Sequence, residues 1–108
     1  QTVDLVRAME ADSGLPMSTL FVDGGMVSNE LLMQFQADVL GVSVVRPVAS
    51  ETTALGAAFA AGLAVGFFES LDEIRSLWVE GRRWEPKMDG AQREGLLAGW
   101  REAVGRAL

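Results

Sequence analysis

Two adjacent glycines, Gly24 and Gly25, lie one residue after a short apolar run and constrain the fold of this chain more than any other feature. The run Leu20–Val22 has the aromatic and β-branched side chains of a buried strand. The glycines permit backbone angles that other residues avoid, and they leave bare main chain that a ligand can approach. A helical pattern follows, and we expect Ser28 to cap it with Glu30 in its first turn. This order predicts a strand, a sharp turn and a helix N-terminus.

The segments around the turn predict an α/β fold. The helix expected over Ser28–Leu40 ends at Gly41, and the β-branched stretch Val42–Arg46 follows as a second strand. A strand, a crossover helix and a second strand form a parallel βαβ unit. In such sheets ligands bind beyond the carboxyl ends of the strands, which is where the glycines lie. The turn is therefore a candidate nucleotide site, although many glycine turns of this kind have a purely structural role.

The crossover helix has an apolar pattern from which its buried face can be predicted. We expect its inward side chains to be Leu32, Phe35, Val39 and Leu40, and we expect Asp38 to face solvent. An earlier helix is expected over Thr2–Ser13, where Gly14 ends it.

The second half of the chain predicts three more helices. The first is capped by Ser50, Glu51 or Thr52, runs to Ala64, and is so rich in small apolar residues that we expect it to be buried. Within it, Gly56 indicates either close backbone packing or room for a nucleotide. A short helix over 70–77 is expected to begin with a capping box formed by Ser70 and Glu73.

The last third of the chain contains all three tryptophans and the final helix. The stretch 78–87 lacks a clear period and predicts an irregular strap or edge segment that Trp78 and Trp84 pin to the core. The final helix, capped by Asp89, is expected to reach about residue 107. Its predicted inner face comprises Leu96, Leu97, Trp100, Ala103, Val104 and Leu108.

Composition excludes several kinds of function. The 108 residues include no cysteine and no histidine, so disulfides, thiolate chemistry and the commonest general base are absent from this chain. A net charge of −6 argues against binding nucleic acid, which requires a basic surface. We see no signal peptide, and the longest uncharged run falls short of the ~20 apolar residues of a membrane span. These features favour a cytoplasmic protein.

Two blocks of the sequence resemble a known enzyme family. Asp23-Gly24-Gly25, followed by three residues and Asn29, is similar to the adenosine motif in the second domain of sugar kinases. The longer stretch 22–38 and the block Glu51–Phe67 resemble the FGGY carbohydrate kinases, and the second block is closest in pattern to members that act on glycerol. The resemblance covers nearly the whole chain. It implies an actin/Hsp70/hexokinase-like (ribonuclease H-like) fold, of which residues 1–108 would form the C-terminal portion of the second, nucleotide-binding domain.

The family resemblance also implies ligands and roles. It implies ATP and Mg²⁺ as cofactors of a phosphoryl transfer, ATP or ADP and glycerol as small-molecule partners, and a homo-oligomeric full-length protein. It implies that Gly25 contacts the nucleotide, that Asn29 contacts the adenine, and that Gly24 shapes the turn. Glycerol and Mg²⁺ would be bound outside this chain, because the family's acceptor site and phosphate loops belong to preceding segments. Asp23 is expected to bond backbone amides in its own turn and to have no catalytic role.

Three functional interpretations remain open from the sequence. The chain can be the nucleotide-binding part of a glycerol-phosphorylating kinase, or the same part of a family member that acts on a pentulose or hexulose. It can also be a non-catalytic domain that binds a nucleotide or a partner. In each case we expect no catalytic residue and no metal ligand in these 108 residues, and we expect the isolated chain to be inactive.

Overall fold

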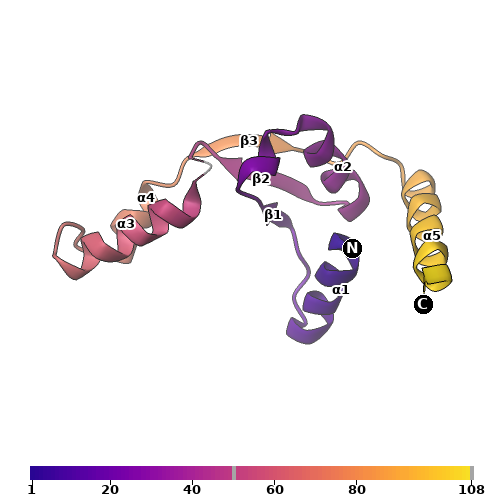
Figure 1. Cartoon of the computed structure of the whole chain (residues 1–108), viewed down its shortest axis with the longest axis horizontal. Helices are drawn as coiled ribbons and strands as arrows, with labels where there is room; N and C mark the ends of the chain where they lie inside the picture. Colours follow the sequence, from indigo (N-terminus) through magenta and orange to yellow (C-terminus); the bar gives the residue numbers. More distant parts are fainter. Residues whose placement is uncertain (50, 108) are drawn as a thin grey trace.

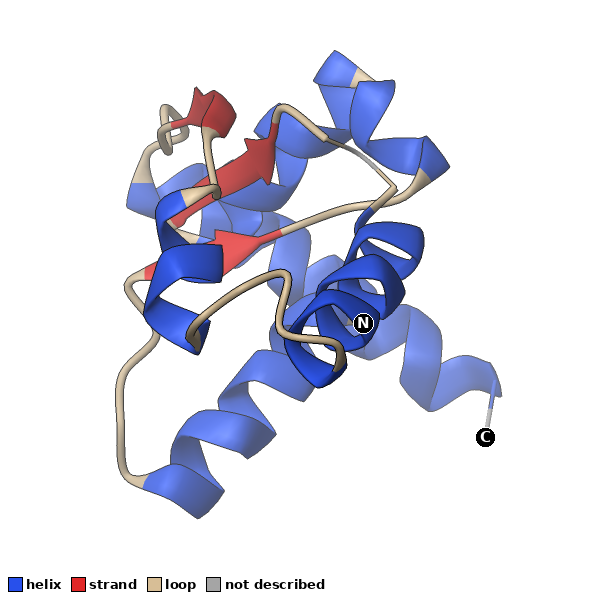
Figure 2. Cartoon of the chain, turned by 90° about the vertical axis from the view of Figure 1, so that its left-hand side faces the viewer, coloured by secondary structure: helices blue, strands red, loops and turns tan. Residues whose placement is uncertain are grey.

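A small mixed sheet, ordered β1-β2-β3, lies at the centre of this computed structural model, which describes residues 1–49 and 51–107 (Figure 1). The elements, in chain order, are α1 (Thr2–Ser13), β1 (Thr19–Phe21), the 3₁₀ turn η1 (Gly25–Ser28), α2 (Glu30–Leu40), β2 (Ser43–Pro47), α3 (Thr52–Ala64), α4 (Leu71–Ser76), β3 (Glu80–Trp84) and α5 (Gly90–Ala107). Seen along the long axis of the molecule, the strands are gathered together with helices on several sides of them (Figure 2).

The predicted parallel βαβ unit is confirmed. β1 pairs in parallel with β2, with Leu20 opposite Val44, and α2 connects the two strands. The stretch after α4 is more regular than the sequence indicated, because it contains β3, an antiparallel edge strand on β2. Gly81 permits this pairing at a bulge, since a Cβ there would lie 2.7 Å from the Pro47 carbonyl oxygen.

The hydrophobic core lies between the sheet and α2. Its buried members are Val27, Met33, Ala37, Val44 and Trp84. Trp84 is only 4% exposed, so the prediction that it pins the edge segment to the core is confirmed. The same prediction for Trp78 is wrong, because this side chain is 47% exposed and packs edge-on against Phe21 at the surface.

The buried face of α2 differs from the predicted one. Met33 and Ala37 are its buried residues, whereas Phe35 is 44% exposed. Asp38 was expected to face solvent, but its Oδ1 accepts hydrogen bonds from the Lys87 N–H at 2.6 Å and the Met88 N–H at 3.2 Å. Partial burial raises the pKa of the Asp38 carboxyl, but these backbone hydrogen bonds outweigh burial and leave the pKa below its usual value. Asp38 thus ties the segment before α5 to α2.

Helix α3 is not buried, contrary to expectation. Apart from Gly62, its residues are exposed or half-buried, and together with α4 it extends away from one end of the sheet (Figure 1). A Cβ at Gly56 would meet nothing within 4 Å, so no close packing within this structure explains that glycine. Glu51 occupies the N-cap position without a side-chain hydrogen bond. Ser50, another predicted cap, lies outside the described residues.

The extended arm makes the molecule long. Its extents are 53 × 28 × 25 Å and its radius of gyration is 17.3 Å, compared with about 13 Å for a compact chain of this size. Ser70 caps α4 as predicted, accepting a hydrogen bond from the Glu73 N–H. No helix in the described part of the chain combines the length and the apolar character that crossing a membrane requires.

Helix α5 docks at the opposite end of the sheet from the arm (Figure 1). Asp89 caps it as predicted, through a hydrogen bond from the Gln92 N–H. Of the predicted inner face only Leu97 is buried, while Leu96, Trp100 and Val104 remain partly exposed, and Leu108 lies outside the described residues. The indole N–H of Trp100 donates to Asp4 Oδ2 of α1 at 2.9 Å, and this hydrogen bond lowers the pKa of the Asp4 carboxyl.

Candidate functional site

The turn after β1 owes its shape to Gly24. The strand ends with the Val22 N–H bonded to the Val45 carbonyl, and Gly24 then adopts φ 86° and ψ 179°. Only glycine populates this region at low cost. The Gly24 carbonyl accepts a hydrogen bond from the Val27 N–H, which starts η1. The expectation that Gly24 shapes the turn is therefore met by its backbone conformation.

Gly25 has no comparable structural reason to be glycine. Its φ is not positive, and a Cβ built on it would meet no atom within 4 Å. The space above its main chain is open to solvent. A side chain at this position would therefore extend beyond the described residues, where it would reduce the room for a ligand or for another segment of the full-length protein.

Both glycines line a groove at the carboxyl ends of the parallel strands. We call it the polar groove; it has a volume of about 530 Å³ and is lined by Gly24, Gly25, Val27, Ser28, Arg46, Pro47, Val48 and Gly81. Arg46, which lies near the end of β2, gives the groove a positive charge. Main-chain N–H groups and a cation are the features that bind anions in proteins.

The cap of α2 is Asn29, and the prediction of Ser28 as the cap is wrong. Asn29 has extended backbone angles and its Oδ1 accepts the Leu32 N–H at 3.0 Å. Ser28 belongs to η1, where its hydroxyl donates to the Gly25 carbonyl at 2.9 Å. The turn therefore continues one residue further than the sequence suggested. Glu30 lies in the first turn of α2, as expected.

Asn29 also lines a second, more apolar depression. We call it the apolar shelf; it is formed by Asn29, Leu31, Leu32 and Phe35 and has a volume of about 360 Å³. Leu31 is 80% exposed on it, so the surface presents hydrocarbon to solvent next to a carboxamide. Because Asn29 Oδ1 is occupied by the cap, its Nδ2 group is the part of the side chain that can donate to a ligand. The linings of the two depressions include consecutive residues: Ser28 lines the polar groove and Asn29 lines the apolar shelf.

Asp23 takes no part in closing the turn. Its side chain is exposed, and within the described residues the side-chain hydrogen bonds of this turn involve Ser28 and Asn29 and not Asp23, contrary to the expectation. Within 1–49 and 51–107, no three carboxylates gather into a group that could hold a metal ion.

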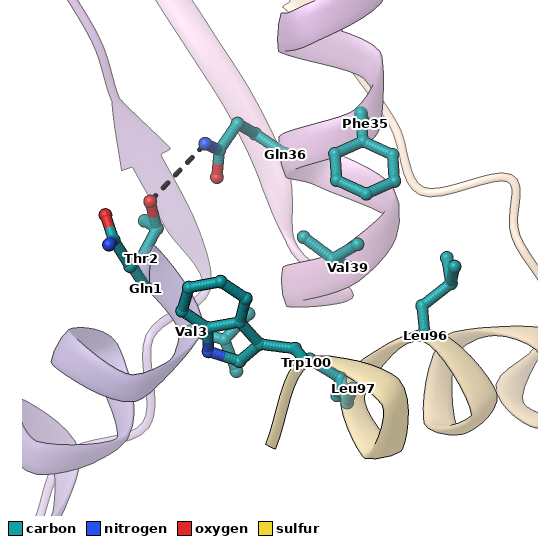
Figure 3. A pocket seen from close by; sticks show the side chains of 9 residues that line it. All are labelled: Gln1, Thr2, Val3, Phe35, Gln36, Val39, Leu96, Leu97 and Trp100. Atoms are coloured by element: carbon teal, nitrogen blue, oxygen red, sulfur yellow. Dashed lines mark hydrogen bonds between the residues drawn. The ribbon is translucent and has the colours of Figure 1, made fainter. Parts of the chain in front are cut away.

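The other large depression lies away from the glycine turn. Side chains of α1, α2 and α5 line it, including Phe35, Val39, Leu97 and Trp100, and its volume is about 470 Å³ (Figure 3). Gln36 contributes a carboxamide whose Nε2 donates to Thr2 Oγ1 at 3.4 Å. Among the described residues, the side chains that line this depression are all uncharged. Packing between helices explains it better than binding of a charged ligand.

Sequence reasoning missed Arg46 and Gly81 as groove residues. Arg46 was predictable in principle, because it lies near the carboxyl end of the strand beside β1, where ligands collect in parallel sheets. Gly81 was not, because it reaches the groove only through the antiparallel pairing of β3. We found no sequence signal for that pairing.

Comparison with known proteins identifies a family. Residues 1–65 match the family described as "FGGY family of carbohydrate kinases, C-terminal domain". The chain is 62% identical over 104 residues to a glycerol kinase of Leifsonia xyli, and 60% identical over 108 residues to one of Mycolicibacterium gilvum. These alignments cover 96% and 100% of the chain but 21% of each relative, so the chain spans about a fifth of the proteins it matches.

Solved structures show the same relationship. A crystal structure of Plasmodium falciparum glycerol kinase with ADP is similar with a TM-score of 0.84 and 34% identity, over 99% of this chain and 22% of that one. A gluconate kinase of Lactobacillus acidophilus is similar with a TM-score of 0.72 over 85% of this chain and 19% of that one. At 20% identity, the second likeness establishes the fold alone.

Proposed function

Because the chain belongs to the FGGY family of carbohydrate kinases, we propose that it forms the nucleotide-binding part of a glycerol kinase, as the C-terminal portion of the second domain. The full-length protein would transfer the γ-phosphoryl group of ATP to glycerol. Identities of 56–62% to glycerol kinases along nearly the whole chain favour glycerol over a pentulose or hexulose.

The division of the site into two depressions suits a nucleotide. The polar groove offers the bare main chain of Gly24 and Gly25 beside a cation, which fits the phosphate side of ADP or ATP. The apolar shelf offers Leu31 and Phe35 for an adenine ring, with Asn29 Nδ2 available to a ring nitrogen. An anion and a purine would thus lie on either side of η1.

Other components of the reaction lie outside these residues in our proposal. Mg²⁺ would be held elsewhere in the full-length enzyme, since the described residues do not gather the carboxylates to ligate it. Glycerol would likewise be bound by preceding segments. We also propose a cytoplasmic location for the full-length protein, which its composition favours, and a homo-oligomeric assembly, which its family resemblance implies.

The observation that carries the proposal is Gly25, whose glycine identity the fold itself does not require. In the full-length protein, Gly25→Ala is expected to preserve thermal stability and to weaken ADP binding by about tenfold or more, because the added methyl group occupies the space of the ligand. Isothermal titration calorimetry with ADP measures this effect.

Gly24→Ala is the matched control for that experiment. At φ 86° and ψ 179° a side chain is strained, so this variant is expected to lose about 1–3 kcal/mol of stability. If Gly25→Ala bound ADP as the wild type does, the main chain at Gly25 would not contact the nucleotide and the proposal would fail.

A second prediction concerns the chain by itself. The purified 108-residue polypeptide, given ATP, Mg²⁺ and glycerol, is expected to form no glycerol phosphate above background, because the proposal places the catalytic base, the Mg²⁺ site and the acceptor site in other segments of the full-length protein. A coupled assay for ADP production tests this. Turnover that depends on glycerol would show that catalytic groups are present in this chain after all.

A further inference from the structure

We propose that Arg46 is a positioning residue for the nucleotide site, and that it acts by fixing η1 between Gly25 and Asn29. The inference rests on the proposed function, since it takes these two residues as the ligand contacts. Arg46 lies in β2, far in sequence from the turn, and its Nη1 donates to the Val27 carbonyl oxygen at 2.9 Å. Val27 is the residue midway between the two contacts.

Val27 is the point at which the turn is attached to the rest of the fold. Its side chain is 4% exposed in the core, and its N–H donates to the Gly24 carbonyl. With its carbonyl held by Arg46, both main-chain groups and the side chain of this residue are fixed. The conformation of η1 sets the orientation of the Gly25 main chain and of the Asn29 side chain. Fixing Val27 therefore also fixes the two proposed ligand contacts, Gly25 and Asn29.

The Arg46 side chain is itself held in one orientation. Its guanidinium lies over the Trp84 ring, with Cζ 5.6 Å from the ring centroid, and its Nη2 is 3.9 Å from Glu30 Oε1. The indole N–H of Trp84 in turn donates to Glu30 Oε2 at 3.0 Å. A planar, always-charged guanidinium can stack on an aromatic ring and donate hydrogen bonds at its edge simultaneously, which an ammonium cannot do as well.

Arg82 provides a matched control within the same cluster. Its Cζ lies 5.5 Å from the Trp84 centroid and its Nη2 is 3.0 Å from Glu30 Oε2. Arg82 therefore makes the same two kinds of contact as Arg46, but it makes no hydrogen bond to Val27 within the described residues and does not line the polar groove. Removing either arginine deletes one positive charge, one cation–π contact and one ion pair. Removing Arg46 in addition takes the positive charge out of the polar groove and releases the turn, and Arg46→Lys, which keeps the charge in the groove, separates these two effects.

The test compares Arg46→Met with Arg82→Met in the full-length protein, with ADP as the probe. Arg46→Met is expected to raise the Kd for ADP about tenfold and the KM for ATP similarly, while the KM for glycerol stays within about twofold. Arg82→Met is expected to leave the Kd for ADP within about twofold. Arg46→Lys, which keeps a donor near Val27 but loses the planar stack, is expected to recover part of the lost affinity.

The possible outcomes separate this inference from the proposed function. Equal ADP affinities in Arg46→Met and Arg82→Met would overturn the inference, as would an equal rise in the KM values of both substrates. If Gly25→Ala weakens ADP binding while Arg46→Met does not, the proposed function stands and only the role of Arg46 is rejected. If Gly25→Ala leaves ADP binding unchanged, both are rejected.

Discussion

Replacing Trp84 with alanine is expected to destabilise the protein more than any other single change considered for this chain. The side chain is 4% exposed, packs in the cluster with Met33 and Val44, and donates its indole N–H to Glu30. Truncating a buried aromatic residue costs about 3–5 kcal/mol. A domain's entire stability is about 5–15 kcal/mol. We therefore expect a large fall in the melting temperature of the full-length protein and a low yield of soluble material.

Trp78→Ala is the control for that measurement. Trp78 is also a tryptophan of the edge segment, but it is 47% exposed and contacts Phe21 only at the surface. Surface substitutions usually change stability by no more than about 0.5 kcal/mol in either direction. Differential scanning calorimetry of both variants gives the comparison. Equal losses of stability would mean that the core is not organised around Trp84.

Asn29→Asp is expected to abolish most of the nucleotide affinity while leaving the fold intact. Aspartate accepts the Leu32 N–H as Asn29 does, and a carboxylate is favoured at a helix N-terminus, so α2 keeps its cap. The variant loses the Nδ2 donor and gains a negative charge beside the adenine. The adenine nitrogen that Asn29 Nδ2 would contact then lacks a hydrogen-bond donor. Leaving such a buried polar group unsatisfied costs about 1–3 kcal/mol, which corresponds to roughly a 5- to 150-fold rise in the Kd for ADP.

Asn29→Ala distinguishes the two roles of this residue. It removes the donor and the cap together, so we expect a loss of affinity accompanied by about 0.5–2 kcal/mol of lost stability. In both variants the KM for ATP should rise far more than the KM for glycerol, because the proposal places the glycerol site outside this chain. A loss of equal size for both substrates, or no loss for either, would remove the assigned role of Asn29.

The parallel core was predictable because its signals are local. The apolar run Leu20–Val22, the helix-ending Gly41 and the β-branched stretch after it specify a strand, a helix end and a strand without reference to distant residues. The caps at Ser70 and Asp89 were found for the same reason. Each depends on a hydrogen bond to a residue three positions further along.

Errors arose where distant contacts decide the outcome. β3 exists because it pairs with β2, and the run of charged residues within Glu80–Trp84 gives little indication of a strand. Asp38 looked like a solvent-facing carboxylate until the chain returned from nearly fifty residues away to donate two N–H groups to it. The cap at Ser28 was misplaced because a 3₁₀ turn intervenes, and serine and asparagine cap helices about equally well.

Helix α3 illustrates a different limit. Its small apolar side chains predict burial, and the structure leaves most of them exposed. The composition of a helix indicates whether it favours a buried environment. It does not indicate whether the segments that would bury the helix belong to the same stretch of chain. The relatives that this chain matches are about five times its length.

For the candidate site, the proposed ligand contacts could be named from the sequence, but their arrangement could not. Gly24, Gly25 and Asn29 came from one contiguous motif. Their separation into a polar groove and an apolar shelf, with Arg46 fixing the turn between them, depends on β2 and therefore on the folded sheet.

The central claim is that a nucleotide lies across η1, with its base on the apolar shelf and its phosphates toward the polar groove. A crystal structure of the full-length protein with ADP tests it most directly. We predict that a ring nitrogen of the adenine lies about 3 Å from Asn29 Nδ2. We also predict that the ADP molecule makes van der Waals contact with the main chain of Gly25. An ADP molecule bound elsewhere, with both residues facing solvent, would contradict the account.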